Sequence, residues 1–393
     1  MTTRYQRIAT VIIALALVAG CGKAEPTSMS MSIPPTVGTT PTAILPAGTL
    51  ASLPPSTPTT VPTEKNGADG LSEEEIATLS SLEQVDGYPL YTMHYYGAYN
   101  ERLSSIEGVE WLVRVDLPDL NPMALSPAWA CSLFAALSDT DNMLYGRNFD
   151  WEYSPAVLLF TDPPDGYASV SIVDIAYLGF GGTKAGTLTD LPLIRRRALL
   201  ETPRMPFDGM NEHGLVIGMA AVPPGHMHPD PKKETIGSLG VIREILDHAS
   251  NVDEAIAILQ SYNIDMQGGP PLHYLVAAPS GRSALVEFYQ GEMVVIPNET
   301  PWHLATNFLR AEAGKSGEGR CWRYDKISQR LAEAEGKITT QDAMELLAEV
   351  SQGDKQGGTQ WSVVYGMGTG DVNVTMGRQY DNLHTFHLSL IGE

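Results

Sequence analysis

The stretch that decides the fold begins Cys131-Ser132-Leu133-Phe134-Ala135-Ala136-Leu137 and ends Gly146-Arg147-Asn148-Phe149-Asp150-Trp151. Between these runs lies the polar segment Ser138-Asp139-Thr140-Asp141-Asn142, and apolar runs around such turn residues predict a β-hairpin. A turn centred near Thr140 brings the start of the first strand beside the end of the second. We therefore expect the Cys131 thiol, the Arg147 guanidinium and the Asp150 carboxylate to converge. Because arginine keeps its proton, it can stabilise a nearby thiolate and lower the pKa of the thiol.

The same residues also have an ordinary structural interpretation. Most cysteines are small buried hydrophobic residues, and Arg147 with Asp150 can form a plain ion pair. In an exported protein, Cys131 can also form a disulfide with Cys321. We favour an unbridged Cys131, because a single bridge is a weak framework for so large a domain.

Composition limits the classes of function. The 393 residues are 43% hydrophobic, which suffices for one large domain or two ordinary ones. The net charge is −21, with 46 acidic residues against 25 basic ones, and no stretch is rich in Lys and Arg. Since phosphate binding needs basic clusters, we do not expect nucleic acid as a partner.

Residues 1–21 have the features of a lipoprotein signal peptide. Arg4 and Arg7 precede a short apolar run that ends at Cys21. The ending Leu17-Val18-Ala19-Gly20-Cys21 resembles the lipobox of bacterial lipoproteins. That resemblance implies cleavage before Cys21, a lipid on its thiol and an exported protein anchored to the bacterial cell membrane. The alternative is an ordinary secretory signal in which Cys21 is incidental.

Three further regions follow the signal. Residues 22–70 are rich in Pro, Thr and Ser and contain no aromatic residue, so they predict an extended tether. Residues 71–130 predict a propeptide-like subdomain: Ser72 with Glu75 fits a capping box, and the aromatic run 88–96 should pack on the catalytic core. Residues 131–393 predict the catalytic domain.

Strands and helices alternate in blocks after Cys131, which suits two sheets sandwiched between helix layers. The predicted strands are 157–160, 167–180, 215–222, 272–278, 283–289, 293–296, 361–365, 372–376 and 383–388. The predicted helices are 240–250, 253–261, 324–335 and 340–351, with Asn251 and Thr339 as caps.

The hairpin resembles that of the N-terminal nucleophile (Ntn) hydrolases of the choloylglycine hydrolase, penicillin V acylase and acid ceramidase-like group, which act on linear amides. In that group a G-R-N-x-D motif follows the Cys at this spacing. Two further segments resemble the group's D-G-x-N-E-x-G-L and T-N elements: Asp208-Gly209-Met210-Asn211-Glu212-His213-Gly214-Leu215 and Thr306-Asn307-Phe308. The resemblance implies an α+β fold, a four-layer αββα sandwich of two antiparallel sheets between helix layers.

The resemblance also implies roles for residues. Asn211 and Asn307 would bind the oxyanion, and Arg320 would be the group's second site arginine, with Arg323 as the alternative. Cleavage of the bond before Cys131 would free its α-amino group. With a pKa of about 7.7–8.0, that amine can act as the base for its own thiol.

In this mechanism Arg147 would hold the thiolate and Asp150 would orient the amine. The apolar segments 157–160 and 172–180 are expected to shape an acyl pocket, so the expected substrate is a small N-acyl amide. Neither a cofactor nor a metal is implied. The oligomeric state is not predicted.

Other interpretations remain at this point. One is acyl transfer to an amine on the same fold. Another is a Cys–His hydrolase without processing, in which His273 or His384 acts as the base. The third is a surface lipoprotein that keeps the fold only as a binding module.

Overall fold

The computed structural model describes residues 70–99, 130–182, 186–225, 228–314, 317–353 and 358–392. The predicted signal peptide, Cys21 and nearly all of the predicted tether lie outside the described residues, as do residues 100–129. None of the described helices has the length and apolar composition needed to cross a membrane.

The described elements follow one another in a fixed order. The first three are α1 (Glu73–Ser80), β1 (Glu83–Asp86) and β2 (Leu90–Tyr95). The chain continues as β3 (Ser132–Ala136), β4 (Leu144–Trp151), β5 (Ala156–Thr161), β6 (Ser169–Asp174), the 3₁₀ segments η2 (Ile175–Leu178), η4 (Leu188–Asp190) and η5 (Leu193–Arg204), β7 (Asp208–Asn211), β8 (Val216–Ala221), β9 (Thr235–Gly237), α4 (Gly240–His248) and α5 (Val252–Ser261). It ends with β10 (Asn263–Asp265), β11 (Leu272–Ala277), β12 (Ser283–Tyr289), β13 (Glu292–Pro297), β14 (Trp302–Ala305), α6 (Arg310–Ala313), α7 (Trp322–Glu333), α8 (Thr340–Glu349), β15 (Gly358–Gly366), β16 (Asp371–Met376) and β17 (His384–His387).

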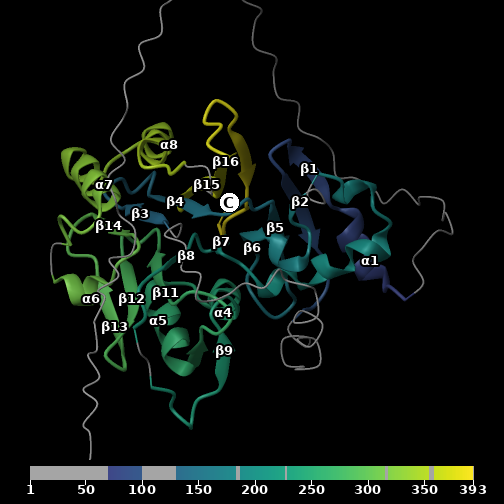
Figure 1. The fold of residues 1–393 in the computed structure, drawn as a ribbon, viewed down its shortest axis with the longest axis horizontal. Helices are drawn as coiled ribbons and strands as arrows, with labels where there is room; N and C mark the ends of the chain where they lie inside the picture. Colours follow the sequence, from purple (N-terminus) through teal and green to yellow (C-terminus); the bar gives the residue numbers. More distant parts are fainter. Residues whose placement is uncertain are drawn as a thin grey trace, which may run out of the picture.

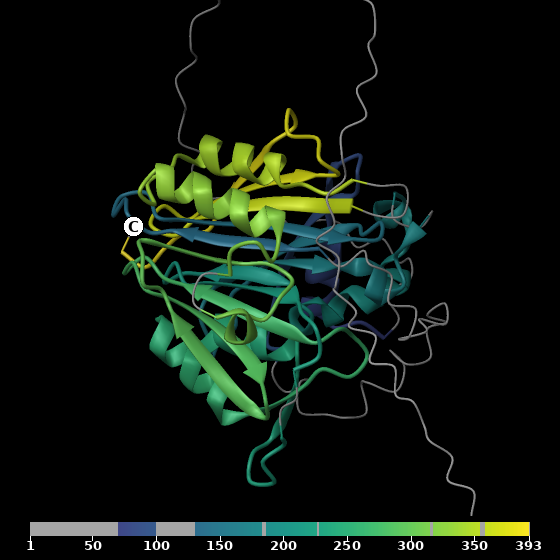
Figure 2. The ribbon, with the colours of Figure 1, turned by 60° about the vertical axis from the view of Figure 1, so that its left-hand side comes forward.

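Two large sheets lie face to face between helices. One sheet has nine strands in the order β1-β2-β5-β6-β7-β8-β11-β12-β13, and the other has six in the order β14-β3-β4-β15-β16-β17. Helices α4 and α5 contact the larger sheet, and α7 and α8 contact the smaller one. Figure 2 shows the resulting layers, with α7 and α8 above the sheets and α4 and α5 below them. The predicted four-layer αββα fold is confirmed; one parallel pair, β2 with β5, departs from the antiparallel pattern.

Strand β3 shows why both faces of the smaller sheet are buried. Leu133 and Ala135 belong to the core between the two sheets, whereas Phe134 and Ala136 belong to the core beneath α7 and α8. Because side chains alternate between the faces of a strand, a strand covered on both sides is apolar throughout. This accounts for the continuous apolar run that follows Cys131.

The segment before Cys131 shares the larger sheet. Strand β2 pairs with β5 over six residue pairs, from Leu90 with Ala156 to Tyr95 with Thr161. The predicted capping box of Ser72 and Glu75 starts α1. Figure 1 shows α1, β1 and β2 beside β5 at one side of the molecule. The described part of the predicted subdomain thus forms one sheet and one core with the residues that follow Cys131.

Local signals explain where most elements begin and end. Asn251 caps α5 by accepting from Glu254 N, and Thr339 with Asp342 forms a capping box at α8, both as predicted. The strand predicted over 167–180 is wrong at its end. Strand β6 stops at Asp174, because the Asp174 side chain accepts from Ala176 N and starts η2.

Candidate active site

The hairpin has the register that the sequence predicts. Strands β3 and β4 pair antiparallel from Ser132 with Asn148 to Ala136 with Leu144, so the turn centres on position 140. Cys131, one residue before β3, therefore lies beside the end of β4 that carries the predicted site residues. Asn148 secures this strand, because its side chain donates to Leu347 O at 2.8 Å and accepts from Ser362 Oγ at 2.6 Å.

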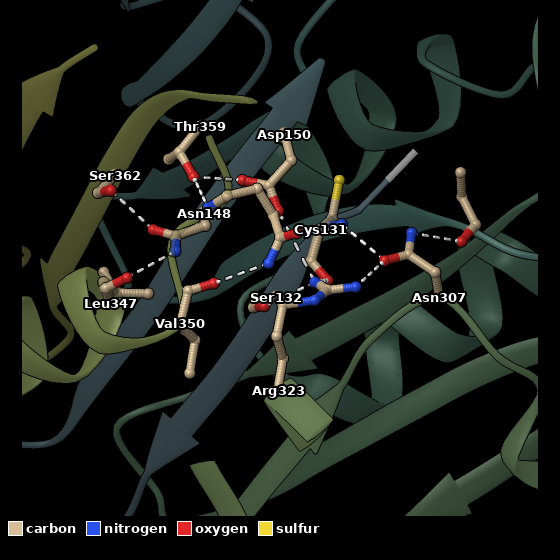
Figure 3. Close-up of polar contacts among 12 residues, drawn as sticks. Cys131, Ser132, Asn148, Asp150, Asn307, Arg323, Leu347, Val350, Thr359 and Ser362 are labelled. Carbon is tan, nitrogen blue, oxygen red and sulfur yellow. Dashed lines mark hydrogen bonds and ion pairs between the residues drawn. The ribbon is translucent and has the colours of Figure 1, made fainter. Parts of the chain in front are cut away.

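Cys131 is a free thiol and only 4% exposed. A Cys131–Cys321 disulfide is therefore excluded. Its backbone N–H donates to Asn307 Oδ1 at 2.7 Å, and its backbone carbonyl accepts from Arg323 Nη1. Figure 3 shows both contacts at the backbone of Cys131. The peptide group on either side of the Cys131 Cα is thus held by side chains from distant segments.

The net shift in the pKa of the Cys131 thiol is opposite to the predicted one. Burial raises the pKa of the Cys131 thiol above its ordinary value, and this effect exceeds the opposing effect of Arg147. Asp150 and Arg323 act in opposite directions on the same pKa. Arg147 does favour the thiolate, as predicted, but in the intact chain the thiol remains protonated at neutral pH.

Asp150 is buried and incompletely satisfied. Its Oδ1 accepts from Thr359 Oγ1 at 2.5 Å. Its Oδ2 lies 3.7 Å from Arg323 Nη1 and has no hydrogen-bond partner. Burial raises the pKa of the Asp150 carboxyl to about 7, although Arg323 and Thr359 act to lower it. One carboxylate oxygen is therefore available to a cation that arrives beside Cys131.

Of the two arginines that the sequence offered, the structure places Arg323, and not Arg320, beside Cys131. Arg320 is exposed. Arg323 is 1% exposed and donates to Ser132 Oγ and to Asn307 Oδ1, both at 2.9 Å. Figure 3 shows its guanidinium between Ser132, Asn307 and Asp150. The sequence carried a signal for this choice, because Arg323 and the buried Ile327 are four residues apart on one face of α7.

Asn211 is not brought to the site. Its Nδ2 donates to Leu246 O and Ala249 O, and its Oδ1 accepts from the backbone N–H groups of His213 and Leu215. All of its hydrogen-bonding capacity is therefore used to hold its own turn against the end of α4. Asn211 lies near the start of β8, whereas the carbonyl that Asn307 contacts belongs to the last residue of β8. At about 3.4 Å per residue, five residues separate these points by about 17 Å.

Asn307 is brought to the site, directly after β14. Its Oδ1 accepts from Cys131 N and Arg323 Nη2, and its Nδ2 donates to Ala221 O at 2.7 Å. These partners fix the orientation of the amide. One N–H of Nδ2 remains for a substrate oxygen.

Arg147 is fully buried, and its partner is a residue whose role sequence reasoning missed. Its Nη1 forms an ion pair with Asp208 Oδ2. It also donates to Phe207 O at 2.7 Å. Asp208 is the first residue of β7 in the opposite sheet, so this pair connects the two sheets beside Cys131.

A cavity of about 220 Å³ opens onto Cys131 and Asp150. Its wall is mostly apolar and includes Phe149, Trp151, Tyr177, Met205, Phe207, Met219, Ala221, Leu239, Pro270 and Leu272. Of the two segments predicted to shape an acyl pocket, only 172–180 contributes, through Tyr177. The rest of the wall comes from the end of β4, from β8, from Met205 and Phe207 before β7, from Leu239 before α4, and from the segment that leads into β11.

His273 and His384 are the candidate bases of the Cys–His alternative, and they lie in different sheets. His384 lies on β17, at the opposite end of the smaller sheet from β3, and contacts Asp86. His273 lies on β11 with its Nδ1 3.0 Å from Glu287 Oε1. The unprocessed Cys–His alternative is therefore left with His273. Within the described ranges, no group of three or more His, Cys, Asp or Glu side chains is arranged to hold a metal ion.

Comparisons with known proteins give two sequence matches. Residues 201–380 match the family model described as acyl-coenzyme A:6-aminopenicillanic acid acyl-transferase. An uncharacterized protein of Paramecium bursaria Chlorella virus 1 is 34% identical over 109 residues, which are 25% of this chain and 38% of that protein. The chain therefore spans well under half the length of this relative.

Two solved structures are similar at low identity. A conjugated bile acid hydrolase variant from Clostridium perfringens is 16% identical, with a TM-score of 0.48 over 66% of this chain and 92% of that chain. Penicillin V acylase from Agrobacterium tumefaciens is 14% identical, with a TM-score of 0.46 over 66% of this chain and 86% of that chain.

The αββα layers and the family match define the class of this protein: it has the fold of the Ntn hydrolases. Over residues 201–380, somewhat less than half of the chain, the sequence is similar to the acyl-coenzyme A:6-aminopenicillanic acid acyl-transferase family.

Proposed function

We propose that this protein is an autoprocessed cysteine amidase that hydrolyses a linear N-acyl amide through an acyl-thioester on Cys131. The observation that carries the proposal is the position of Cys131. It is a free thiol directly before β3, lies beside Arg147 and lines a mostly apolar cavity. A cavity of this composition suits an apolar acyl group.

Self-cleavage would come first. The Cys131 sulfur attacks the carbonyl carbon of Ala130, the carbon–nitrogen bond breaks, and the thiol proton moves to the released α-amine. Water then hydrolyses the thioester, which leaves a carboxylate on Ala130 and a free thiol on Cys131. Asn307 and Arg323 support this step, because they hold the N–H and C=O groups of Cys131.

The free α-amine would then serve as the base in substrate turnover. As an ammonium group it can pair with Asp150 Oδ2, which lacks a hydrogen-bond partner in the intact chain. The thiolate attacks the substrate carbonyl, the amine product leaves with a proton from the α-ammonium, and water releases the acid. Asn307 Nδ2 and Arg147 would donate to the developing oxyanion.

Intact mass and N-terminal sequencing of the purified protein test the proposal. We expect a chain that begins at Cys131, and hydrolysis of a panel of phenoxyacetyl and fatty-acyl amides. Cys131→Ala should abolish both cleavage and hydrolysis. Active amidase in which the Ala130–Cys131 bond is intact would refute the autoprocessing mechanism.

Acyl transfer is the second candidate, because the matching family model is named for an acyltransferase. The two functions share every step up to the thioester and differ only in the acceptor. Adding a primary amine during turnover separates them. A hydrolase forms the free acid at an unchanged rate, whereas a transferase forms the new amide in preference to the acid.

The segment before Cys131 should stay bound after cleavage. Leu90, Tyr91 and Met93 of β2 are fully buried, and Tyr99 OH donates to the buried Asp247 at 2.9 Å. Separating the two chains would expose this core and break the six-residue pairing of β2 with β5. A tag at the C-terminus should therefore recover both chains in equal amounts.

We also propose that the protein is an exported lipoprotein held at the bacterial cell membrane through Cys21. The lipobox-like ending Leu17–Cys21 supports this location. After cleavage, the catalytic chain would be attached to the membrane only through its non-covalent contacts with the segment that contains β2.

A further inference from the structure

A buried ion pair crosses the space between the two sheets next to Cys131. Arg147 belongs to β4 of the smaller sheet and Asp208 to β7 of the larger one, and neither side chain is exposed to solvent. Arg147 Nη1 contacts Asp208 Oδ2 and donates to Phe207 O. One of the three guanidinium nitrogens is therefore committed to the opposite sheet.

The other two nitrogens of Arg147 are not committed. Nε and Nη2 are buried and have no hydrogen-bond partner among the described residues. The guanidinium carbon lies 5.1 Å from the ring centre of Phe149 and 5.9 Å from that of Trp361. At these distances cation–π attraction helps to fix the group. The guanidinium is thus held in place with two donors unused, and Cys131 is the nucleophile beside it.

Asp208 is itself held by side chains of β15. Tyr365 OH donates to Asp208 Oδ1, and Trp361 Nε1 donates to Asp208 Oδ2 at 3.4 Å. Both β15 residues are fully buried. The carboxylate therefore has a fixed position, and through it Arg147 has one as well.

We propose that Asp208 is a positioning residue: it holds Arg147 by Nη1, so that Nε and Nη2 face the Cys131 sulfur and the oxygen of an attacked substrate. This inference rests on the proposed function of Cys131. Tyr365, on the strand next to that of Arg147, donates to the other carboxylate oxygen of Asp208. Because Asp208 carries a negative charge, it also offsets part of the attraction that Arg147 exerts on a thiolate.

The charged groups that face Cys131 are Arg147 and Asp150 from β4 and Arg323 from α7. Asp208 affects Cys131 only through its ion pair with Arg147. Removing its charge as Asp208→Asn should therefore have two opposite effects. The thiolate gains stability, because Arg147 is no longer offset, while turnover slows because the guanidinium is no longer held. A purely structural ion pair would not produce this combination.

The test measures the rate of iodoacetamide labelling at Cys131 against pH, together with kcat and KM for an acyl amide. For Asp208→Asn we expect the labelling midpoint to fall by about one pH unit, which is about a tenfold faster reaction below the midpoint. We expect kcat to fall about tenfold or more while KM changes little, as for a misplaced catalytic group.

Tyr365→Phe is the second variant, because removing one partner of a buried ion pair can prevent folding. It keeps the ring but removes the O–H that Asp208 accepts. With less of its charge neutralised, Asp208 should move the labelling midpoint to higher pH, and kcat should fall by a smaller factor than in Asp208→Asn.

Asp247→Asn is the matched control, because Asp247 forms a buried ion pair with Arg243 on the outer side of the larger sheet. Its labelling midpoint should equal that of wild type. Unmoved midpoints in both Asp208→Asn and Tyr365→Phe, or shifts in the same direction, would overturn the inference. A wild-type protein that is labelled but hydrolyses no amide would refute the proposed function instead, because the labelling requires only the thiol.

Discussion

The effect of Asp150→Asn on the stability of the protein should change sign when the chain is cleaved before Cys131. In a Cys131→Ala chain, which cannot cleave itself, we expect Asp150→Asn to stabilise the protein at pH 8 and to leave it nearly unchanged at pH 4. The reason is that the Asp150 carboxyl is buried, with a pKa raised to about 7, and one of its oxygens lacks a hydrogen-bond partner.

The magnitude follows from the shift in pKa. A rise from the ordinary 3.8 to about 7 is about three pKa units. At about 1.4 kcal/mol per unit, this corresponds to about 4 kcal/mol. The folded state binds the proton more tightly than the unfolded state does. The stability that the protonated Asp150 carboxyl contributes is therefore complete below pH 4 and is lost as the pH rises toward 7. Asparagine has no proton to lose, so Asp150→Asn escapes this loss.

The assay is urea unfolding followed by tryptophan fluorescence at pH 4 and at pH 8. The Cys131→Ala chain is compared with the same chain carrying Asp150→Asn. In processed protein with an intact Cys131, the new α-ammonium should pair with Asp150. There Asp150→Asn should destabilise the protein at pH 8. An equal effect of Asp150→Asn at both pH values in the uncleaved chain would refute the assignment of a raised pKa. Destabilisation in both chains would refute the idea that cleavage supplies the missing partner.

Three further outcomes are expected. Arg323→Ala should lower the free energy of unfolding in urea by about 3–5 kcal/mol, because it leaves the buried Asp150 without its cation. Arg320→Ala should change the same free energy by no more than about 0.5 kcal/mol. Equal losses in the two variants would favour Arg320 again as the site arginine. Gly146→Ala should destabilise by about 1–3 kcal/mol, because its Cβ would lie 2.3 Å from Phe134 Cζ. In the same unfolding assay, Phe134→Leu in the Gly146→Ala background should recover part of that loss. Cys21→Ser should move the protein from the membrane fraction to the soluble fraction on immunoblots, and unchanged membrane association would argue against lipidation.

The hairpin at Cys131 was predictable because its determinants are local. Two apolar runs and a polar turn fix the register, and register alone brings Cys131 beside the end of β4. The caps at Asn251 and Thr339 were predictable for the same reason, since each bond spans three residues. Strand β6 ends earlier than predicted, because the Asp174 side chain accepts from Ala176 N and stops a run that would otherwise continue as a strand. The short strands β7, β9, β10 and β14 were not predicted.

The two predicted site residues that the structure does not bring to Cys131, Arg320 and Asn211, depend on information beyond the motif. Arg320 and Arg323 both follow the same turn, and only the helix that starts at Trp322 decides which of them points inward. Asn211 sits in a motif that fits the family, but its amide is saturated by backbone groups of its own turn and of the segment at the end of α4. A motif match identifies the residue type at a position, and the packing around it decides where that side chain is used.

Asp208 shows the limit of sequence reasoning more clearly. It is 61 positions from Arg147, in the other sheet, and the packing of one sheet on another is not encoded by any local period. Once the pair is known, the charges around Cys131 can be added: Arg147 and Arg323 are balanced by Asp208 and Asp150. In the intact chain this balance leaves burial to decide the state of the thiol, which remains protonated. Under the proposed mechanism, cleavage would add one ammonium group beside Asp150 and give the site a net positive charge. The same bond break that creates the base would thus also favour the thiolate.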